Sequence, residues 1–186
     1  LKQQAVPAAP LQRLDAERMM ADLSWLAAAE RQGRAPGTAG GIAARLWIAE
    51  QFATIGLAPA GSEGYLHPYS VTEHFSLRRW FRGKNAVIPG VADAANVLGL
   101  LAGTESGLKP LIITAHYDHL RSRGTKIFNG ADDNASGTAA LVALAQILSH
   151  QELKSNVLFI AFSGEENGLW GSNYFVKNPT IDLKTV

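Results

Sequence analysis

The sequence contains no cysteine, which excludes disulfide bonds, thiolate metal ligands and a cysteine nucleophile. Any metal bound by this chain must therefore use histidine and carboxylate side chains. The sequence also has no marked excess of either charge, because 17 basic residues balance 16 acidic ones and leave a formal net charge of +1. With this balance and no basic stripe, there is no reason to expect nucleic acid as a partner.

Long hydrophobic runs are absent as well. No segment approaches the roughly 18 consecutive apolar residues of a membrane-spanning helix, so we expect no membrane span. The sequence opens LKQQAVPAAP without Met, as either a mature exported protein, periplasmic or secreted, or an arbitrary boundary; we favour export. Residues 1–13 are expected to form a flexible arm, and residues 14–186 the N-terminal portion of a single domain.

The hydrophobic pattern predicts an α/β fold. Helical spacing and end signals indicate helices over about 15–30, 38–55, 134–148 and 168–177. Residues 57–93 suggest edge strands and a long connection, whereas 96–101, 110–115 and 157–162 are short apolar runs typical of strands covered on both faces. Strand, helix, strand implies a parallel crossover. We therefore predict a mostly parallel central sheet with helices on both faces, and a lead-in to another strand over 181–186.

Three polar clusters lie at strand exits or before a helix. They are HYD at 116–118, GADDNASG at 130–137 and SGEENGLWGS at 163–172. Ligands in open α/β sheets gather beyond the carboxyl ends of the strands, and buried charges persist only when paired or bound to a metal. The clusters therefore predict one metal site.

Individual residues in these clusters suggest different roles. His116 can reach a metal while Asp118, two residues on, orients it through the other ring nitrogen. Of the pair Asp132 and Asp133, the first is equally well explained as a helix N-cap and the second is assigned to metal. His119 is interpreted as a solvated loop residue.

Adjacent Glu165 and Glu166 follow the strand at 157–162. Neighbouring side chains diverge at a strand end, so one carboxylate can bind metal while the other serves as a general base. A solvated pair of glutamates that opens a helix is the alternative.

Together, HYDHL, GADDNASG and SGEENGLWGS resemble the co-catalytic di-zinc aminopeptidases of the bacterial leucyl aminopeptidase type, over about residues 95–180. The resemblance implies a metal-dependent exopeptidase that hydrolyses the N-terminal peptide bond of peptides with a free N-terminus. It also implies two Zn²⁺ ions and the following roles: His116 as ligand of one zinc, Asp118 as its partner, Asp133 as bridge, Glu166 as ligand of the other zinc and Glu165 as general base. A cis peptide bond between Asp133 and Asn134 is implied too.

The chain departs from this family in two ligands. The resemblance implies another Asp soon after the glutamate pair and a distal His, but after Glu166 the only Asp is Asp182 and no His follows His150. Each zinc would then have two protein ligands, where three or four are usual. We therefore expect a chain truncated at its C-terminus, with weak or absent zinc binding and no activity on its own. An uncovered sheet edge would favour self-association or pairing with the missing C-terminal portion.

Three alternatives remain open. A carboxypeptidase or a glutaminyl cyclase can use the same scaffold, although GLWGS after the glutamate pair ranks the cyclase lower. A non-catalytic, receptor-like domain is the third, and the intact Glu165 argues against it.

Overall fold

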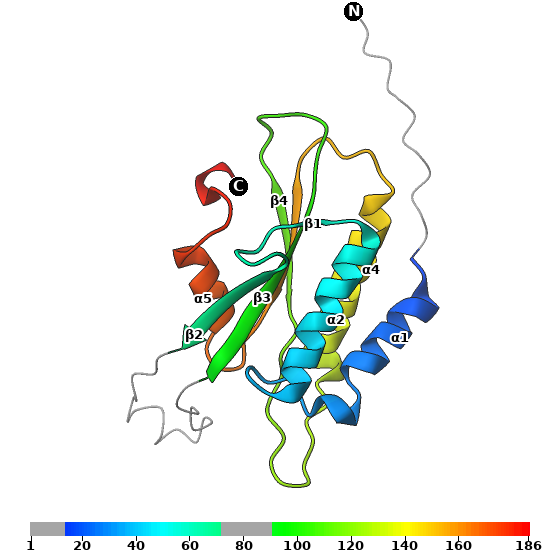
Figure 1. The fold of residues 1–186 in the computed structure, drawn as a ribbon. Helices are drawn as coiled ribbons and strands as arrows, with labels where there is room; N and C mark the ends of the chain where they lie inside the picture. Colours follow the sequence, from blue (N-terminus) through cyan, green and yellow to red (C-terminus); the bar gives the residue numbers. More distant parts are fainter. Residues whose placement is uncertain (1–13, 72–90) are drawn as a thin grey trace, which may run out of the picture.

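The computed structural model describes residues 14–71 and 91–186. The predicted flexible arm at 1–13 lies outside the described residues, as does most of the long connection predicted within 57–93. The described chain folds into a sheet with helices on both of its faces (Figure 1). The α/β class predicted from the sequence is thus confirmed.

The described residues contribute five strands to the sheet, in the order β1-β3-β5-β4 with β2 also paired to β3. β1 and β2 pair with successive stretches of β3, so that Ala58 lies opposite Leu100 and Leu66 opposite Val97. β4 lies at the end of this order and pairs only with β5 among the described strands. The strands are β1 (Ala58–Pro59), β2 (Leu66–Val71), β3 (Val91–Leu101), β4 (Leu111–His116) and β5 (Val157–Phe162).

The prediction of a mostly parallel sheet is wrong for the described strands. Only β4 and β5 run parallel, whereas β3 is antiparallel to β1, β2 and β5. The short connection at 102–110 returns the chain from the end of β3 to the same end of the sheet, so β4 runs opposite to β3; β5 is parallel to β4 and lies between the two, and it is therefore antiparallel to β3. The apolar run of β5 is buried on both faces as expected, whereas β4, at the end of the strand order, has no fully buried residue and leaves Leu111 exposed. Neither run carried information on strand direction.

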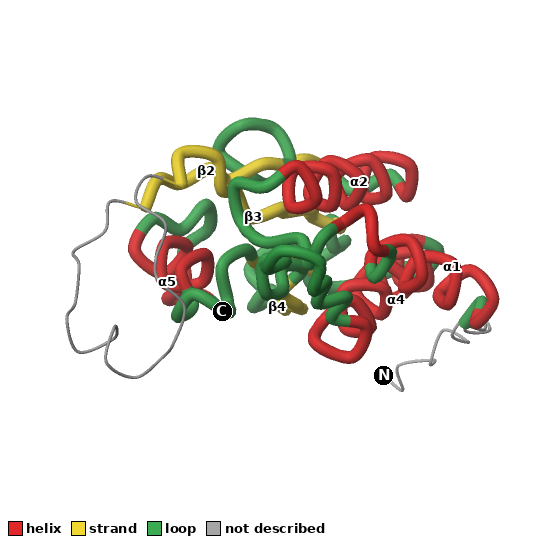
Figure 2. The backbone as a smooth tube through the Cα atoms, turned by 90° about the horizontal axis from the view of Figure 1, so that it is seen from below, coloured by secondary structure: helices red, strands yellow, loops and turns green. Residues whose placement is uncertain are grey.

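Helices cover both faces, as predicted. α1 (Ala16–Leu26), α2 (Ala39–Ile55) and α4 (Ser136–Ser149) lie on one side and α5 (Trp170–Lys177) lies on the other (Figure 2). Alternate residues of β5 point to opposite faces: Phe159 joins the cluster built with α1, α2 and α4, while Leu158 packs with Phe175 of α5. The crossover from β4 through α4 to β5 is parallel, which confirms that part of the prediction.

Polar side chains and a glycine set the helix ends predicted from the sequence. The Asp15 side chain accepts a hydrogen bond from Arg18 N at the start of α1, and Thr38 Oγ1 accepts one from Gly41 N at the start of α2. Gly56, with φ of 91°, ends α2. The predicted lead-in to a strand at 181–186 is instead a 3₁₀ turn, η3 (Leu183–Thr185), which the Asp182 carboxylate caps through Lys184 N.

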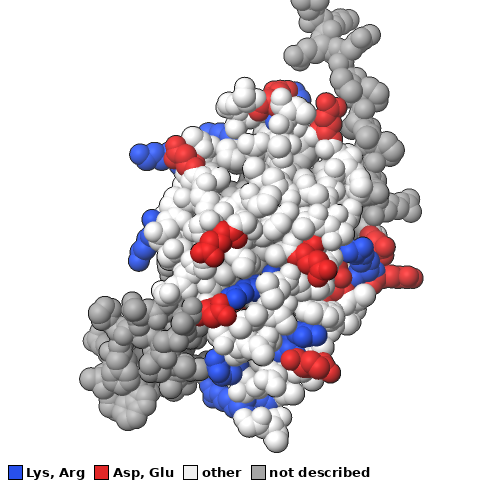
Figure 3. All heavy atoms as spheres, in the orientation of Figure 1, with Lys and Arg blue, Asp and Glu red and all other residues white. Residues whose placement is uncertain are grey.

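The surface of the described chain carries mixed charge. Acidic and basic side chains lie interspersed on the face seen in Figure 3, in keeping with the net charge of +1. None of the helices in the described ranges combines the length and the apolar character that crossing a bilayer requires.

The packing of α5 on β2 leads to a prediction about pH. His67 is 3% exposed. The centroid of its ring lies 5.0 Å from the ring centroid of Tyr174 and 6.1 Å from that of Phe175. Burial lowers the pKa of His67, and the backbone of Asn178 opposes that shift. Below an unfolded pKa of about 6.5, the unfolded chain takes up a proton that the folded chain resists, so stability falls as the pH falls.

Urea denaturation at about pH 7.5 and about pH 5 tests this prediction. The midpoint of the wild type should fall more between the two pH values than that of His67→Phe, which keeps an aromatic ring but cannot titrate. His150→Phe, at an exposed position, should behave as the wild type. Equal falls in all three proteins would contradict the role of His67.

Candidate metal centre

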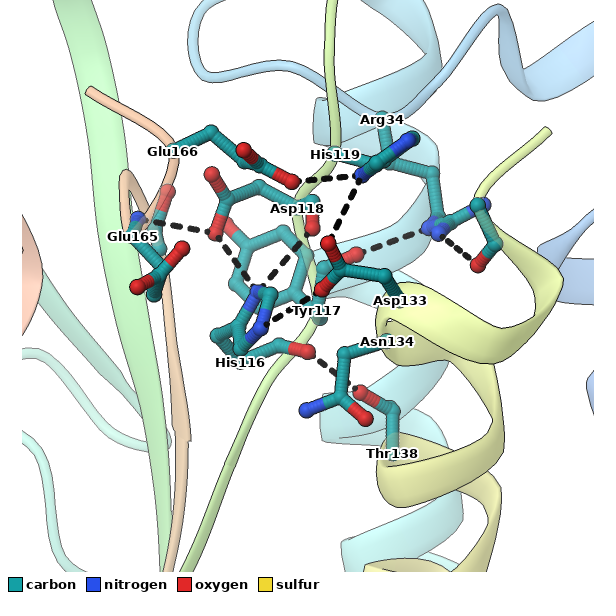
Figure 4. A network of polar contacts seen from close by, with 12 residues as sticks. Arg34, His116, Tyr117, Asp118, His119, Asp133, Asn134, Thr138, Glu165 and Glu166 are labelled. Carbon is teal, nitrogen blue, oxygen red and sulfur yellow. Dashed lines mark hydrogen bonds and ion pairs between the residues drawn. The ribbon is translucent and has the colours of Figure 1, made fainter. Parts of the chain in front are cut away.

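The parallel pairing of β4 and β5 brings two polar loops to one edge of the sheet. His116 pairs with Phe162, the last residues of the two strands, and Tyr117 N donates to Phe162 O at 2.9 Å. The start of α4 reaches the same edge, because Thr138 Oγ1 donates to His116 O at 3.0 Å. All three predicted clusters therefore meet there (Figure 4).

His116 lies between two aspartates. Its Nδ1 is 3.2 Å from the backbone oxygen of Asp118, and its Nε2 is 3.2 Å from Oδ1 of Asp133. A carbonyl oxygen only accepts, so in the tautomer with the proton on Nδ1 this contact is a hydrogen bond and the Nε2 lone pair is directed at Asp133. The Asp118 carboxylate was expected to orient the ring; the backbone carbonyl of the same residue makes the hydrogen bond, and the carboxylate lies at 3.8 Å.

Asp118 is fully buried behind His116. Its Oδ1 accepts a hydrogen bond from Glu165 N at 3.2 Å, and its Oδ2 has no hydrogen-bond partner among the described residues. Burial raises the pKa of this carboxyl to about 7, against the opposing effects of the Glu165 N–H and of His116. An added cation near His116 would favour the ionised form of Asp118, so this environment suits a metal ion.

Asp133 presents one carboxylate oxygen to each of two imidazoles. Its Oδ1 faces His116 Nε2, and its Oδ2 lies 3.9 Å from His119 Nδ1. The side chain is 62% exposed and stands on a π-helical turn, η2 (Ala131–Ala135), that leads into α4. The peptide bond to Asn134 is cis, as the resemblance implied.

The Asp132 side chain does not cap α4, whose N-cap position is Ala135. Asn134 Oδ1 accepts a hydrogen bond from Gly137 N in the first turn of α4, whereas Asp132 contributes its backbone oxygen to Ser136 Oγ. The helix starts at Ser136, two residues later than predicted, because the π-helical turn precedes it.

Glu165 and Glu166 stand on the turn after β5, and their side chains point in different directions (Figure 4). Glu166 is directed at His119, with its Oε1 2.6 Å from His119 Nδ1, and its side chain is 18% exposed. Glu165 is half-buried and donates its backbone N–H to Asp118. The divergence expected of neighbours at a strand end is therefore present.

Buried polar side chains from β2 and β3 hold this turn. Ser163 N donates to Asn96 Oδ1 at 3.1 Å, and Asn96 Nδ2 donates to Gly171 O at 3.0 Å. Tyr69 Oη donates to Ser163 O at 2.8 Å. Asn96 has no solvent exposure, so a buried side-chain amide fixes the position of the turn that carries Glu165 and Glu166.

His119 is the residue that the sequence analysis placed wrongly. Its side chain is only 14% exposed, and its Nδ1 lies near both Glu166 and Asp133 instead of facing solvent. The backbone turns His119 into the centre because His119 N donates to Gly33 O at 2.8 Å. That partner lies far away in the sequence, so no local pattern revealed the position.

The Arg34 side chain connects the segments of the centre through hydrogen bonds. It is fully buried, and its guanidinium donates to four backbone carbonyl oxygens, at 2.7–2.9 Å. Burial lowers the pKa of Arg34 to about 10, opposed by the charges of Asp118 and Asp133. The four oxygens belong to Leu26, Tyr117, Asn129 and Gly130.

These residues offer donors that suit zinc. Donor atoms of His119, Asp133 and Glu166 all lie within 4.8 Å of one another, and His116 faces the other oxygen of Asp133. Imidazole nitrogen and carboxylate oxygen are ordinary zinc ligands. The residues present therefore fit a metal ion, and the donor set is larger than the three ligands named from the sequence.

Comparisons with known proteins agree with this chemistry. Residues 96–186 match the model of peptidase family M28. A probable zinc metalloprotease of Pyrenophora tritici-repentis (strain Pt-1C-BFP) is 35% identical over 156 residues, which cover 79% of this chain and 30% of the relative. The chain thus spans less than a third of the length of that curated relative.

Solved structures share the fold. A Zn-dependent exopeptidase from Parabacteroides distasonis superposes with a TM-score of 0.71 at 20% identity, covering 93% of this chain and 59% of that one. A glutaminyl cyclase from Fimbriiglobus ruber gives a TM-score of 0.66 at 20% identity, covering 91% of this chain and 57% of that one. At these identities the likeness concerns the fold alone.

The hydrogen bonds of Arg34 predict a large effect of its removal. Arg34→Ala should lower the free energy of unfolding by about 3–5 kcal/mol, because four buried carbonyl oxygens lose their donor. Arg34→Lys should lower it less, since an ammonium keeps the charge but lacks the planar fork. Urea denaturation measures both, with Arg121→Ala at an exposed position as control. A loss below about 1 kcal/mol for Arg34→Ala would contradict the role given to Arg34.

Proposed function

We propose that the whole protein is a zinc-dependent exopeptidase acting on the N-terminal peptide bond, because residues 96–186 match the model of peptidase family M28. The proposed substrate is a peptide with a free N-terminus. The match to this family and the likeness to zinc metalloproteases support zinc-dependent peptide hydrolysis, and the preference for the amino end is taken from the resemblance to the aminopeptidases.

The observation that carries the proposal is the position of Asp133 between two imidazoles. One carboxylate oxygen faces His116 and the other faces His119, beside Glu166. A carboxylate that presents its two oxygens in this way can bridge two cations, which in two-metal hydrolases lie about 3.5–4 Å apart. We therefore assign His116, Asp133 and Glu166 as metal ligands, with two zinc ions in the complete site.

Zinc bound there would supply a Lewis acid that polarises the scissile carbonyl and lowers the pKa of water. The chain itself supplies the proton transfer. We assign Glu165 as the general base that takes a proton from the attacking water and delivers it to the leaving amine. The Asp118 carboxylate accepts a hydrogen bond from Glu165 N, and the Asp118 backbone carbonyl contacts His116 Nδ1. Asp118 thereby positions both residues.

The proposed activity belongs to a protein with more ligands than residues 1–186 supply. Neither the second Asp nor the distal His that the resemblance implies is present after Glu166. We propose that residues 1–186 alone are inactive for this reason, and the activity test accordingly uses the full-length protein.

Replacement of the proposed base gives a direct test. Glu165→Gln in the full-length protein should lower kcat for an amino-acid p-nitroanilide by about 100–10,000-fold, because the carboxylate that accepts the proton is lost. Zinc content, measured by elemental analysis, should stay unchanged, since Glu165 is not assigned as a ligand. Glu105→Gln, which removes an exposed carboxylate paired with Lys154, is the matched control and should keep full activity.

The substrate tested decides among the alternatives. Acetylation of the anilide at its amino group should abolish hydrolysis, as expected for an enzyme that needs a free N-terminus. Release of C-terminal residues would show a carboxypeptidase, and ring closure of an N-terminal glutaminyl peptide would show a cyclase. Absence of all three activities in the zinc-loaded, full-length protein would overturn the proposal in favour of a non-catalytic domain.

A further inference from the structure

His119 lies where two carboxylates from different segments meet. Its Nδ1 is 2.6 Å from Glu166 Oε1 and 3.9 Å from Asp133 Oδ2. Figure 4 shows the three side chains reaching this point from the loop after β4, the turn before α4 and the turn after β5. One donor atom from each residue lies within 4.8 Å of the other two.

Two glycines build the position of this ring. A Cβ atom on Gly130 would lie 2.5 Å from His119 Cγ, so the imidazole occupies space that any other residue at 130 would fill. A Cβ atom on Gly33 would lie 1.9 Å from Leu120 O, and Gly33 O accepts the hydrogen bond from His119 N. The chain is therefore shaped around His119 on both the ring side and the backbone side.

Among the described residues, neither Asp133 nor Glu166 pairs with a lysine or arginine side chain; both face His119. Arg34 is buried nearby, but its hydrogen bonds go to four backbone carbonyl oxygens. Without a metal, a hydrogen bond from His119 Nδ1 to Glu166 provides part of the compensation. A cation bound among the three donors would provide it more fully.

The distances fit a zinc-sized ion. Ligand atoms bound to zinc at about 2.0–2.2 Å in a tetrahedral arrangement lie about 3.3–3.6 Å from one another. The two measured separations from His119 Nδ1, 2.6 and 3.9 Å, fall on either side of that spacing. An ion bound there would separate His119 Nδ1 and Glu166 Oε1 by about 0.7–1.0 Å more than they are now.

We infer that His119 Nδ1 is a protein ligand of one metal position, together with Glu166 and Asp133. This inference rests on the proposed function only in taking the metal to be zinc or a close substitute. It raises the number of protein ligands at that position from two to three, while the position of His116 and Asp133 keeps two. The described residues should therefore hold one ion tightly and a second one weakly, which revises the expectation of weak or absent zinc binding.

A positioning role is the competing account of the same contact. His119 could only hydrogen-bond to Glu166 and orient it, and losing a partner of that kind typically weakens metal binding by about 10–100-fold. Loss of a direct ligand should weaken it by more than about 100-fold and should also remove an imidazole from the coordination shell. The presence or absence of this imidazole in the coordination shell of the metal therefore distinguishes a ligand from a positioning residue.

The test uses Co²⁺ as the probe, titrated into the 186-residue chain and followed by visible absorption and X-ray absorption fine structure. At one equivalent, the wild type should show imidazole bound to cobalt. His119→Ala should lose that imidazole and weaken binding by more than about 100-fold. His119→Gln, which can still hydrogen-bond to Glu166, should show the same losses and serves if the alanine variant does not fold. His116→Ala should keep the imidazole, and His150→Ala, an exposed histidine, should match the wild type.

Opposite results would overturn the inference. Imidazole that persists in His119→Ala, or binding restored by His119→Gln to within tenfold of the wild type, would show a positioning role. Loss of imidazole in His116→Ala would show that the other position fills first. Because no peptide enters this experiment, its failure is distinct from absence of peptidase activity in the full-length protein.

Discussion

Four backbone carbonyl oxygens from three separate segments converge on the buried guanidinium of Arg34, and the centre depends on that convergence. The segments are the end of α1, the residue between His116 and Asp118, and the loop before the π-helical turn that carries Asp133. Gln32, Gly33 and Arg34 all adopt left-handed backbone conformations, two of them without being glycine. Such conformations cost free energy, and the hydrogen bonds of the guanidinium offset that cost.

A second constraint acts from the sheet. The parallel pairing of β4 and β5 requires the crossover through α4, and this crossover brings the start of α4 to the same edge as the two strand ends. Asn96, from the antiparallel neighbour β3, fixes the turn that carries the glutamates. The crossover and the Asn96 amide thus hold the segments that carry Asp133 and the two glutamates, and the donors converge at one edge of the sheet.

Much of the fold could be predicted because its signals are local. Thr38 and Gly56 mark the two ends of α2 correctly, and the apolar run at 157–162 coincides with β5. Strand direction could not be predicted from such runs, since burial on both faces is common to parallel and antiparallel central strands. The turn at Leu183–Thr185 also differs from expectation, because a side-chain cap at Asp182 favours a 3₁₀ turn over an extended segment.

The candidate site divides in the same way. His116, Asp133 and Glu166 stand out because each follows a strand or precedes a helix, and the structure brings them to one edge. His119 did not stand out, since an extended continuation of β4 would turn it away from the face of His116 and Asp118. The direction of the His119 side chain depends on the hydrogen bond from His119 N to Gly33 O. The role of Arg34 likewise depends on carbonyl groups that are distant in the sequence. Finally, β4 is an edge strand of the described sheet, and no described strand pairs with it on the side away from β5. A strand added there in the parallel sense would end beside His116, at the same edge where the donors of the centre lie.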